Sequence, residues 1–166
     1  MRVAVYAGSF DPITSGHLSI LDEAVRLFER IFVVVAVNPA KATMFTEEER
    51  VRLAREATAP YPNVTCTSTK GLIVDFAKAH GAAWLLRGIR GSIDSEYEMS
   101  LAQINQALAP EISTLFLLAR PDAAVVSSSL LKELARCGAP MSHYCPPVVE
   151  RALRERMLGL QNGGPR

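Results

Sequence analysis

Residues 6–24 read YAGSFDPITSGHLSILDEA, and this stretch decides how the chain begins to fold. It continues an apolar run, RVAVYAG, that is typical of a buried strand. The run ends in Gly8, and a Ser-Phe-Asp-Pro turn, a second glycine and one histidine follow it. The apolar residues of the second half recur at helical spacing: Leu18, Leu21, Val25 and Phe28. The stretch therefore predicts a strand that passes through a tight turn directly into a helix.

The same alternation of strands and helices continues along the chain. Further strands are predicted at residues 31–38, 64–69, 82–88 and 112–119. Helices are predicted at residues 45–58, 72–81, about 94–109 and 127–138, with a last amphipathic helix after the Pro146-Pro147 break. Five strands alternating with helices predict a single doubly wound α/β domain with a five-stranded parallel sheet. We expect this domain to span residues 1–160, with a frayed tail at residues 161–166.

Composition narrows the classes of protein to which the chain can belong. Its 166 residues suffice for one domain, and its net charge of +1 gives no reason to expect a nucleic-acid or membrane partner. No apolar run approaches the about 20 residues of a membrane span. Three cysteines without a C-x-x-C motif suit a reducing cytosol, so we expect a cytoplasmic protein without a cysteine metal site.

Polar and cationic residues follow four of the predicted strands. Parallel α/β sheets bind ligands at the carboxyl ends of their strands, so these residues are candidates for one site. They are Gly8, Ser9, Phe10 and His17 after the first strand, Lys41 after the second, Arg87 and Arg90 after the fourth, and Arg120 and Ser127 to Ser129 after the fifth. Cationic side chains, hydroxyls and helix amino termini at one edge indicate a phosphate site.

Each of these residues also has an ordinary structural explanation. Lys41 alone would be a solvated loop residue, Glu98 could serve as the capping-box partner of Ser95, and Asp11 before Pro12 is most simply turn chemistry. The familiar nucleotide motifs G-x-x-x-x-G-K-[ST] and G-x-G-x-x-G are absent, as is the G-x-S-x-G of hydrolases. The phosphate interpretation thus depends on the agreement of four strand ends.

The motifs resemble those of a known superfamily. TSGH, residues 14–17, is similar to the T/H-x-G-H signature of the nucleotidyltransferases, and VSSSLLKE resembles their serine-rich second motif. Together with NPAKATMFTEEER and RGIRGSIDSEYEM, in this order and over residues 3–158, they most resemble the bacterial phosphopantetheine adenylyltransferase family.

The resemblance implies a Rossmann-like nucleotidyltransferase fold and the penultimate step of coenzyme A synthesis. In this reaction AMP passes from ATP to 4′-phosphopantetheine, giving dephospho-coenzyme A and pyrophosphate. It also implies a Mg²⁺ ion held mainly through phosphates and water, without dedicated protein ligands. A homohexamer and feedback inhibition by coenzyme A are implied in the same way.

The resemblance assigns roles to residues at the predicted strand ends. The implied catalytic residues are His17, Lys41 and Arg90, and those that contact phosphopantetheine are Ser9, Lys41, Ile73 and Arg87. Those implied for ATP are Ser9, Phe10, His17, Gly88, Ile89, Arg90, Glu98, Ala123, Ala124, Val125, Val126, Ser127, Ser128 and Ser129. A phosphate nucleophile needs no general base, so we expect His17 to stabilise charge on the α-phosphate during in-line attack. Gly16 is expected to let the nucleotide approach the backbone.

Two alternatives stay open at this point. Related nucleotidyltransferases act on nicotinamide mononucleotide or, with CTP, on glycerol phosphate, although they usually have a histidine where this chain has Thr14. A non-catalytic nucleotide-binding regulator could share the fold. Gly71, Ser95 and the pair Ala123-Ala124 depart from the usual family residues.

Overall fold

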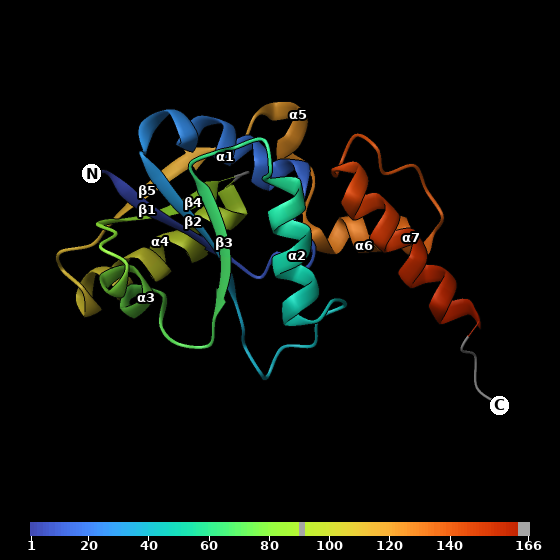
Figure 1. The fold of residues 1–166 in the computed structure, drawn as a ribbon, viewed down its shortest axis with the longest axis horizontal. Coiled ribbons are helices and arrows are strands. Elements are labelled where there is room, and N and C mark those ends of the chain that lie inside the picture. The colour runs from blue at the N-terminus through green and yellow to red at the C-terminus, as the bar shows by residue number, and fades with distance from the viewer. Residues whose placement is uncertain (90–91, 163–166) are drawn as a thin grey trace.

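A five-stranded parallel sheet forms the centre of the protein (Figure 1). The computed structural model describes residues 1–89 and 92–162. The strands are β1 (Val3–Gly8), β2 (Arg30–Ala36), β3 (Val64–Thr69), β4 (Trp84–Ile89) and β5 (Ser113–Leu118). They pair in the order β3-β2-β1-β4-β5, and every pairing is parallel. The predicted doubly wound α/β fold is therefore confirmed.

Helices connect the strands and continue beyond the sheet. They are α1 (Ser15–Leu27), α2 (Glu47–Ala57), α3 (Ile73–Ala79), α4 (Ser92–Leu108), α5 (Pro121–Ala124), α6 (Ser128–Arg136) and α7 (Pro147–Asn162). The short α5 was not predicted, and it begins with a proline at its first position. The helix α7 reaches Asn162, so the first two residues of the predicted frayed tail are helical. Residues 163–166 of that tail lie outside the described residues.

Both faces of the sheet are buried because the central strands are apolar at successive positions. Along β1, Ala4 and Tyr6 belong to a core shared with α1, α2, α6 and α7. Val3 and Val5 alternate with them and belong to a second core with α3 and the chain just after α4. Each buried Val or Leu side chain stabilises the fold by about 1.5–3 kcal/mol. The continuous apolar runs in the sequence reflect this burial on both sides.

Strand order places a crevice at the centre of the sheet. The chain leaves β1 towards β2 and β3, and then crosses to the other side of β1 to form β4 and β5. The carboxyl ends of β1 and β4 therefore lie side by side where the winding direction reverses, which is where such folds bind ligands.

The last two helices extend the molecule beyond the sheet (Figure 1). The helix α7 packs against α2 and α6 rather than on the sheet itself. The start of α2 has the predicted capping box, in which Glu49 N–H donates to Thr46 Oγ1 and Thr46 N–H donates to Glu49 Oε2. Within the described residues, no helix combines the length and the apolar composition needed to cross a bilayer.

Candidate active site

A cavity of about 560 Å³, here called the main cavity, opens at the carboxyl ends of β1 and β4. Its walls come from the residues after β1, the start of α1, the loop after β2, the start of α3, the end of β4 and one face of α4. Nine of the residues implied by the resemblance line it: Ser9, Phe10, His17, Lys41, Ile73, Arg87, Gly88, Glu98 and Val126. The fold thus gathers into one cavity residues that are far apart in the sequence.

His17 is fixed by the residue that caps its own helix. Its Nδ1 accepts a hydrogen bond from Thr14 N–H at 3.0 Å and lies 3.0 Å from Thr14 Oγ1. In return, His17 N–H donates to Thr14 Oγ1 at 3.4 Å, so the two residues form a capping box. A nitrogen that accepts from a backbone N–H has no proton of its own. The ring proton therefore belongs to Nε2, which makes that nitrogen the hydrogen-bond donor of His17.

Two aromatic rings hold the imidazole of His17 from the side of β1. Phe10 packs edge-on against His17 with ring centroids 4.9 Å apart, and Tyr6 packs against Phe10. Phe10 has a φ of 42°, which is uncommon for a residue with a side chain, and its surface is 1% exposed. Phe10 is among the residues that line the main cavity, and contact of its backbone with ATP stays a prediction.

Gly16 allows two backbones to meet at the start of α1. A Cβ at this position would lie 3.0 Å from the carbonyl oxygen of Ala123 and 3.2 Å from that of Val126. Gly16 also lines the main cavity, so the expectation that it makes room for a nucleotide stays a prediction, and the structure adds a second reason for the glycine. The missing side chain lets the segment that follows β5 pack closely on α1, which brings Val126 to the wall of the main cavity.

Arg87 and Glu98 form an ion pair inside the main cavity. Arg87 Nε donates to Glu98 Oε2, and Arg87 Nη1 donates to the carbonyl of Ala7 at 3.0 Å. Both side chains are about four-fifths buried. The charge of Arg87, which the sequence places directly after an apolar strand, therefore has an acidic partner as well as a cavity position. Glu98 is paired with Arg87 and does not act as a capping residue, because α4 begins at Ser92.

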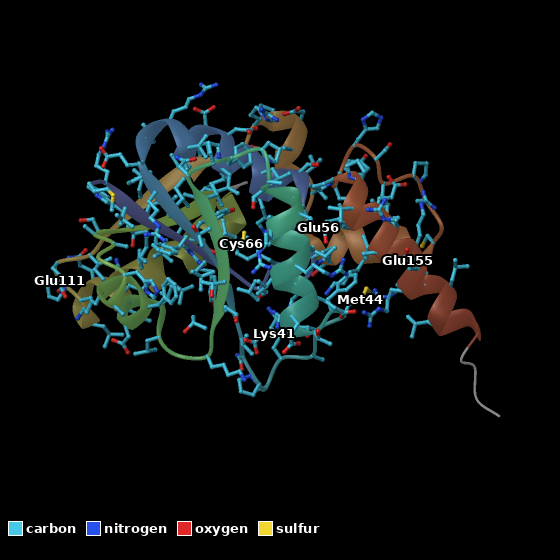
Figure 2. The ribbon with its side chains drawn as sticks, in the orientation of Figure 1. Lys41, Met44, Glu56, Cys66, Glu111 and Glu155 are labelled. Carbon is cyan, nitrogen blue, oxygen red and sulfur yellow. The ribbon has the colours of Figure 1, made fainter. Side chains whose placement is uncertain are left out.

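Lys41 differs from the other lysines of the chain. Lys70, Lys78 and Lys132 each pair with a carboxylate, at 3.6, 3.0 and 2.8 Å respectively. Lys41 lines the main cavity, and it has no carboxylate partner within the described residues. Figure 2 shows it on the loop that follows β2, far from Glu111 at the opposite end of the sheet. An exposed ammonium group without a partner is available to an anionic ligand.

Some implied residues lie next to the main cavity and do not line it in this structure. Ser127 caps α6 by accepting from Leu130 N–H, and the Ser128 hydroxyl donates to the carbonyl of Pro12 at 2.8 Å. Ser129 continues the first turn of α6. Ile89, Ala123, Ala124 and Val125 are also absent from the lining, and Val125 is exposed. Arg90 lies outside the described residues.

Arg120 does not join the cationic residues of the main cavity, although the sequence places it after a strand. Its guanidinium donates to Asp22 on α1 at 3.1 Å, and its backbone N–H donates to Ser19 Oγ at 2.9 Å. Asp22 also accepts a hydrogen bond from Tyr61. Burial raises the pKa of Tyr61, and this hydrogen bond raises it further, to about 12. The expectation that Arg120 faces the phosphate edge is therefore wrong.

Sequence reasoning identified Glu98 but missed two residues on the same face of α4. Glu98, Leu101 and Asn105 all line the main cavity, and their spacing of three and four residues puts them on the same side of the helix. Helical periodicity around Glu98 was the signal that could have identified Leu101 and Asn105. Tyr6 and Tyr97 also line the main cavity.

Comparison with known proteins shows the class of enzyme to which the chain belongs. Residues 5–134 match the Cytidylyltransferase-like family, and the protein belongs to it. The fold is also that of a crystal structure of a protein provisionally named nicotinate-nucleotide adenylyltransferase, from Vibrio parahaemolyticus. The two share 15% identity with a TM-score of 0.69, over 96% of this chain and 93% of the other. The chain is thus a nucleotidyltransferase by fold and by family.

Closer relatives narrow the class. The phosphopantetheine adenylyltransferase of Frankia alni is 47% identical over 95% of this chain and 99% of the relative. That of Levilactobacillus brevis is 45% identical over 96% of this chain and 99% of the relative. The chain belongs to the phosphopantetheine adenylyltransferase family.

Proposed function

We propose that this protein transfers AMP from ATP to 4′-phosphopantetheine, releasing pyrophosphate and forming dephospho-coenzyme A. The observation that carries the proposal is the main cavity, in which His17, Lys41 and Arg87 converge from three separate segments. Near-full-length similarity to proteins named phosphopantetheine adenylyltransferase supports the same reaction.

The chemistry needs placement and charge more than proton transfer. The substrate phosphate is an anion at neutral pH, so one of its oxygens attacks the α-phosphorus of ATP directly. The bond from that phosphorus to the bridging oxygen breaks in line, and pyrophosphate leaves with the electron pair. Donors aimed at the oxygens of the α-phosphate stabilise the charge that builds there. The Nε2–H of His17, whose direction Thr14 fixes, supplies such a donor.

We assign the remaining implied residues by their place around the main cavity. Lys41 and Arg87 bind the phosphate of phosphopantetheine, and Ile73 at the start of α3 contacts the pantetheine arm. Ser9, the backbone of Phe10, Gly88 and Glu98 face the nucleotide. The start of α6, with Ser128 and Ser129, binds the pyrophosphate portion, a role that helix amino termini perform well.

We propose that Mg²⁺ enters with ATP and is held mainly through phosphates and water. Among the described residues that line the main cavity, Glu98 is the one carboxylate, and Arg87 occupies it. A single paired carboxylate does not make a protein-built site for Mg²⁺, whereas triphosphate oxygens and water suit its octahedral preference. The ion, when bound, neutralises charge on the phosphates.

The finer assignments of assembly and regulation are proposals as well. We expect the homohexamer that the resemblance implies, and light scattering would measure its mass. Tyr97, Ile104 and Leu108 share one exposed face of α4, which offers an apolar surface for contact between copies. Coenzyme A contains both the adenylate and the pantetheine parts of the substrates, so we expect it to inhibit by occupying the main cavity.

A cytoplasmic location suits the three free cysteines.

The experiment that tests the reaction measures pyrophosphate release with ATP and Mg²⁺. Three samples receive 4′-phosphopantetheine, nicotinamide mononucleotide or no acceptor. Release with phosphopantetheine alone is the expected result. Release with nicotinamide mononucleotide alone would keep the superfamily and overturn the proposed acceptor. No release in any sample, from folded protein that still binds ATP, would favour a non-catalytic regulator.

A further inference from the structure

Asp11 joins two segments that line the main cavity. It belongs to the β1 turn, residues 8–11, which also contains Ser9 and Phe10. Its carboxylate reaches the Lys41 loop, residues 37–46, where Oδ2 accepts from Met44 N–H and Oδ1 accepts from Phe45 N–H, both at 2.9 Å. Both carboxylate oxygens of one residue therefore hold the loop that contains Lys41.

A third segment meets at the same carboxylate. Lys132 of α6 donates from Nζ to Asp11 Oδ2 at 2.8 Å, and the two side chains are 19% and 5% exposed. The Ser128 hydroxyl of α6 donates to Pro12, the residue next to Asp11. Asp11 thus lies where the β1 turn, the Lys41 loop and the start of α6 come together.

The contacts of Asp11 are not those of a turn residue. An aspartate that shapes its own turn bonds to a backbone N–H about two residues further along the chain. Here the two backbone donors lie 33 and 34 residues away. Burial alone would raise the pKa of Asp11, but the hydrogen bonds from Lys132, Met44 and Phe45 together keep that pKa below its usual range. The carboxylate is therefore charged at neutral pH, and a charge this buried requires all three donors.

The two ends of the Lys41 loop are tied to other elements, since Val37 N–H donates to the carbonyl of Thr69 and the ring of Phe45 is buried in the core. Around Lys41 itself the backbone bonds are local. Lys41 N–H donates to the carbonyl of Asn38, and Ala40 N–H donates to Asn38 Oδ1, so these bonds stay within the loop. We propose that Asp11 is a positioning residue that holds Lys41 at the correct distance from the β1 turn, and so from the phosphate substrate. This inference rests on the proposed function, in which Lys41 binds the phosphate of phosphopantetheine.

A double-mutant cycle tests whether Asp11 acts through Lys41. Four proteins are compared by calorimetry with 4′-phosphopantetheine and, separately, with ATP: wild type, Asp11→Asn, Lys41→Ala and the double variant. We expect Asp11→Asn to weaken phosphopantetheine binding by about tenfold in the wild-type background and by less than about twofold in the Lys41→Ala background. A lysine that has been removed cannot be misplaced. Equal losses in both backgrounds would overturn the inference, as would equal losses for ATP and phosphopantetheine.

Two further variants separate positioning from general damage to the fold. Asp22→Asn is the matched control, because Asp22 also accepts from two side chains, Tyr61 and Arg120, and is absent from the lining of the main cavity. We expect Asp22→Asn to leave phosphopantetheine affinity within about twofold of wild type. Lys132→Met removes the ammonium group and leaves both backbone bonds to Asp11. It replaces Asp11→Asn as the test variant if Asp11→Asn does not fold.

For Lys132 we expect Lys132→Met to weaken phosphopantetheine severalfold and Lys132→Arg to restore most of the affinity. No change in affinity with Lys132→Met would overturn the inference if Asp11→Asn does not fold. Failure of the proposed function has a separate signature, since Lys41→Ala would then leave phosphopantetheine affinity unchanged. If only the present inference fails, Lys41→Ala still weakens phosphopantetheine binding, and the losses in affinity from Asp11→Asn and Lys41→Ala add up in the double variant.

Discussion

Two cavities in the described part of the protein differ in the state of their charges. The main cavity lies at the centre of the sheet, whereas a second cavity of about 290 Å³ lies between α2 and α7. The second cavity is lined by Phe45, Glu49, Arg52, Ala152, Glu155, Arg156, Gly159 and Leu160. Its two arginines are engaged, because Arg156 pairs with Glu49 and Arg52 pairs with Glu56. An anion that entered it would have to compete with these carboxylates.

In the main cavity, the positive charge of Lys41 is available to an anionic ligand. Its one carboxylate among the described lining residues, Glu98, is balanced by Arg87, and Lys41 remains without a carboxylate partner in that part of the chain. His17 adds a hydrogen-bond donor whose direction is fixed. Arginines line both cavities, so the feature that distinguishes the anion site is a cation without a carboxylate partner among the described residues.

The largest expected effect comes from His17, which should matter in the transition state and little in substrate binding. We expect His17→Ala to lower kcat about 10²–10³-fold with ATP affinity nearly unchanged. Pyrophosphate release and calorimetry with ATP measure the two quantities. His80→Ala is the matched control, because the ring of His80 also contacts a phenylalanine ring, that of Phe76, and His80 is absent from the lining of the main cavity. Parallel losses of binding and turnover in His17→Ala would contradict the assigned role.

The free ammonium group of Lys41 should give the next largest effect. We expect Lys41→Ala to weaken 4′-phosphopantetheine by about 10–100-fold, the usual strength of a charge-assisted hydrogen bond, with a smaller effect on ATP. Lys70→Ala removes a lysine that pairs with Glu47, and it should leave both affinities near wild type. If Lys70→Ala and Lys41→Ala weaken binding equally, the distinction between paired and unpaired lysines fails.

Two glycines, one in each cavity wall, should respond in opposite directions to the same substitution. Gly16→Ala places a Cβ 3.0 Å from the Ala123 carbonyl, so we expect a loss of about 1–3 kcal/mol in the free energy of unfolding. Gly159→Ala meets nothing within 4 Å in α7, so we expect a gain of about 0.5–1 kcal/mol from helix propensity. Urea unfolding measures both. A Gly16→Ala protein as stable as wild type would show that the 123–126 segment can shift without cost.

Local patterns in the sequence were sufficient to place the five strands and most of the helices along the chain. Continuous apolar runs located the buried strands, and the Thr46 capping box located the start of α2. Strand order, in contrast, follows from packing of the whole chain. The location of the site could still be predicted, because the motifs follow strands and parallel strands share one carboxyl edge. The four-residue α5 was missed, since a single turn has too few residues for a periodic signal.

Side-chain partners were the part of the site that the sequence could not provide. Asp11 bonds to residues more than 30 positions away, and Arg87 pairs with Glu98 across two elements. Arg120 has the same residue type and the same place after a strand as a phosphate ligand, yet Asp22 on α1 holds it. Whether an arginine or lysine pairs with a carboxylate depends on which residues lie near it in the folded protein. The spacing of sequence motifs carries no information about those neighbours.

The smallest expected effect concerns the balanced charges of the second cavity. The backbone N–H of Thr46, together with Arg156, keeps the pKa of Glu49 below its usual value despite some burial. A carboxyl with a lowered pKa in the folded state stabilises the protein above its unfolded pKa, and this stability is lost as the pH falls through the folded pKa. Glutamine retains the capping box, so Glu49→Gln removes mainly the ion pair.

We therefore expect Glu49→Gln to cost about 0.5–1 kcal/mol at pH 7, as partly exposed pairs do. The difference from wild type should shrink below about pH 4.5, where an unfolded glutamate becomes protonated, and vanish once the folded carboxyl is protonated too. Urea unfolding at pH 7 and at several acidic values measures this difference. Glu155→Gln is the control, because Glu155 lines the same cavity without an ion pair in the described part of the chain. If Glu49→Gln still lowered the free energy of unfolding at low pH, the loss would come from packing. The ion pair between Glu49 and Arg156 would then not be what stabilises this cavity.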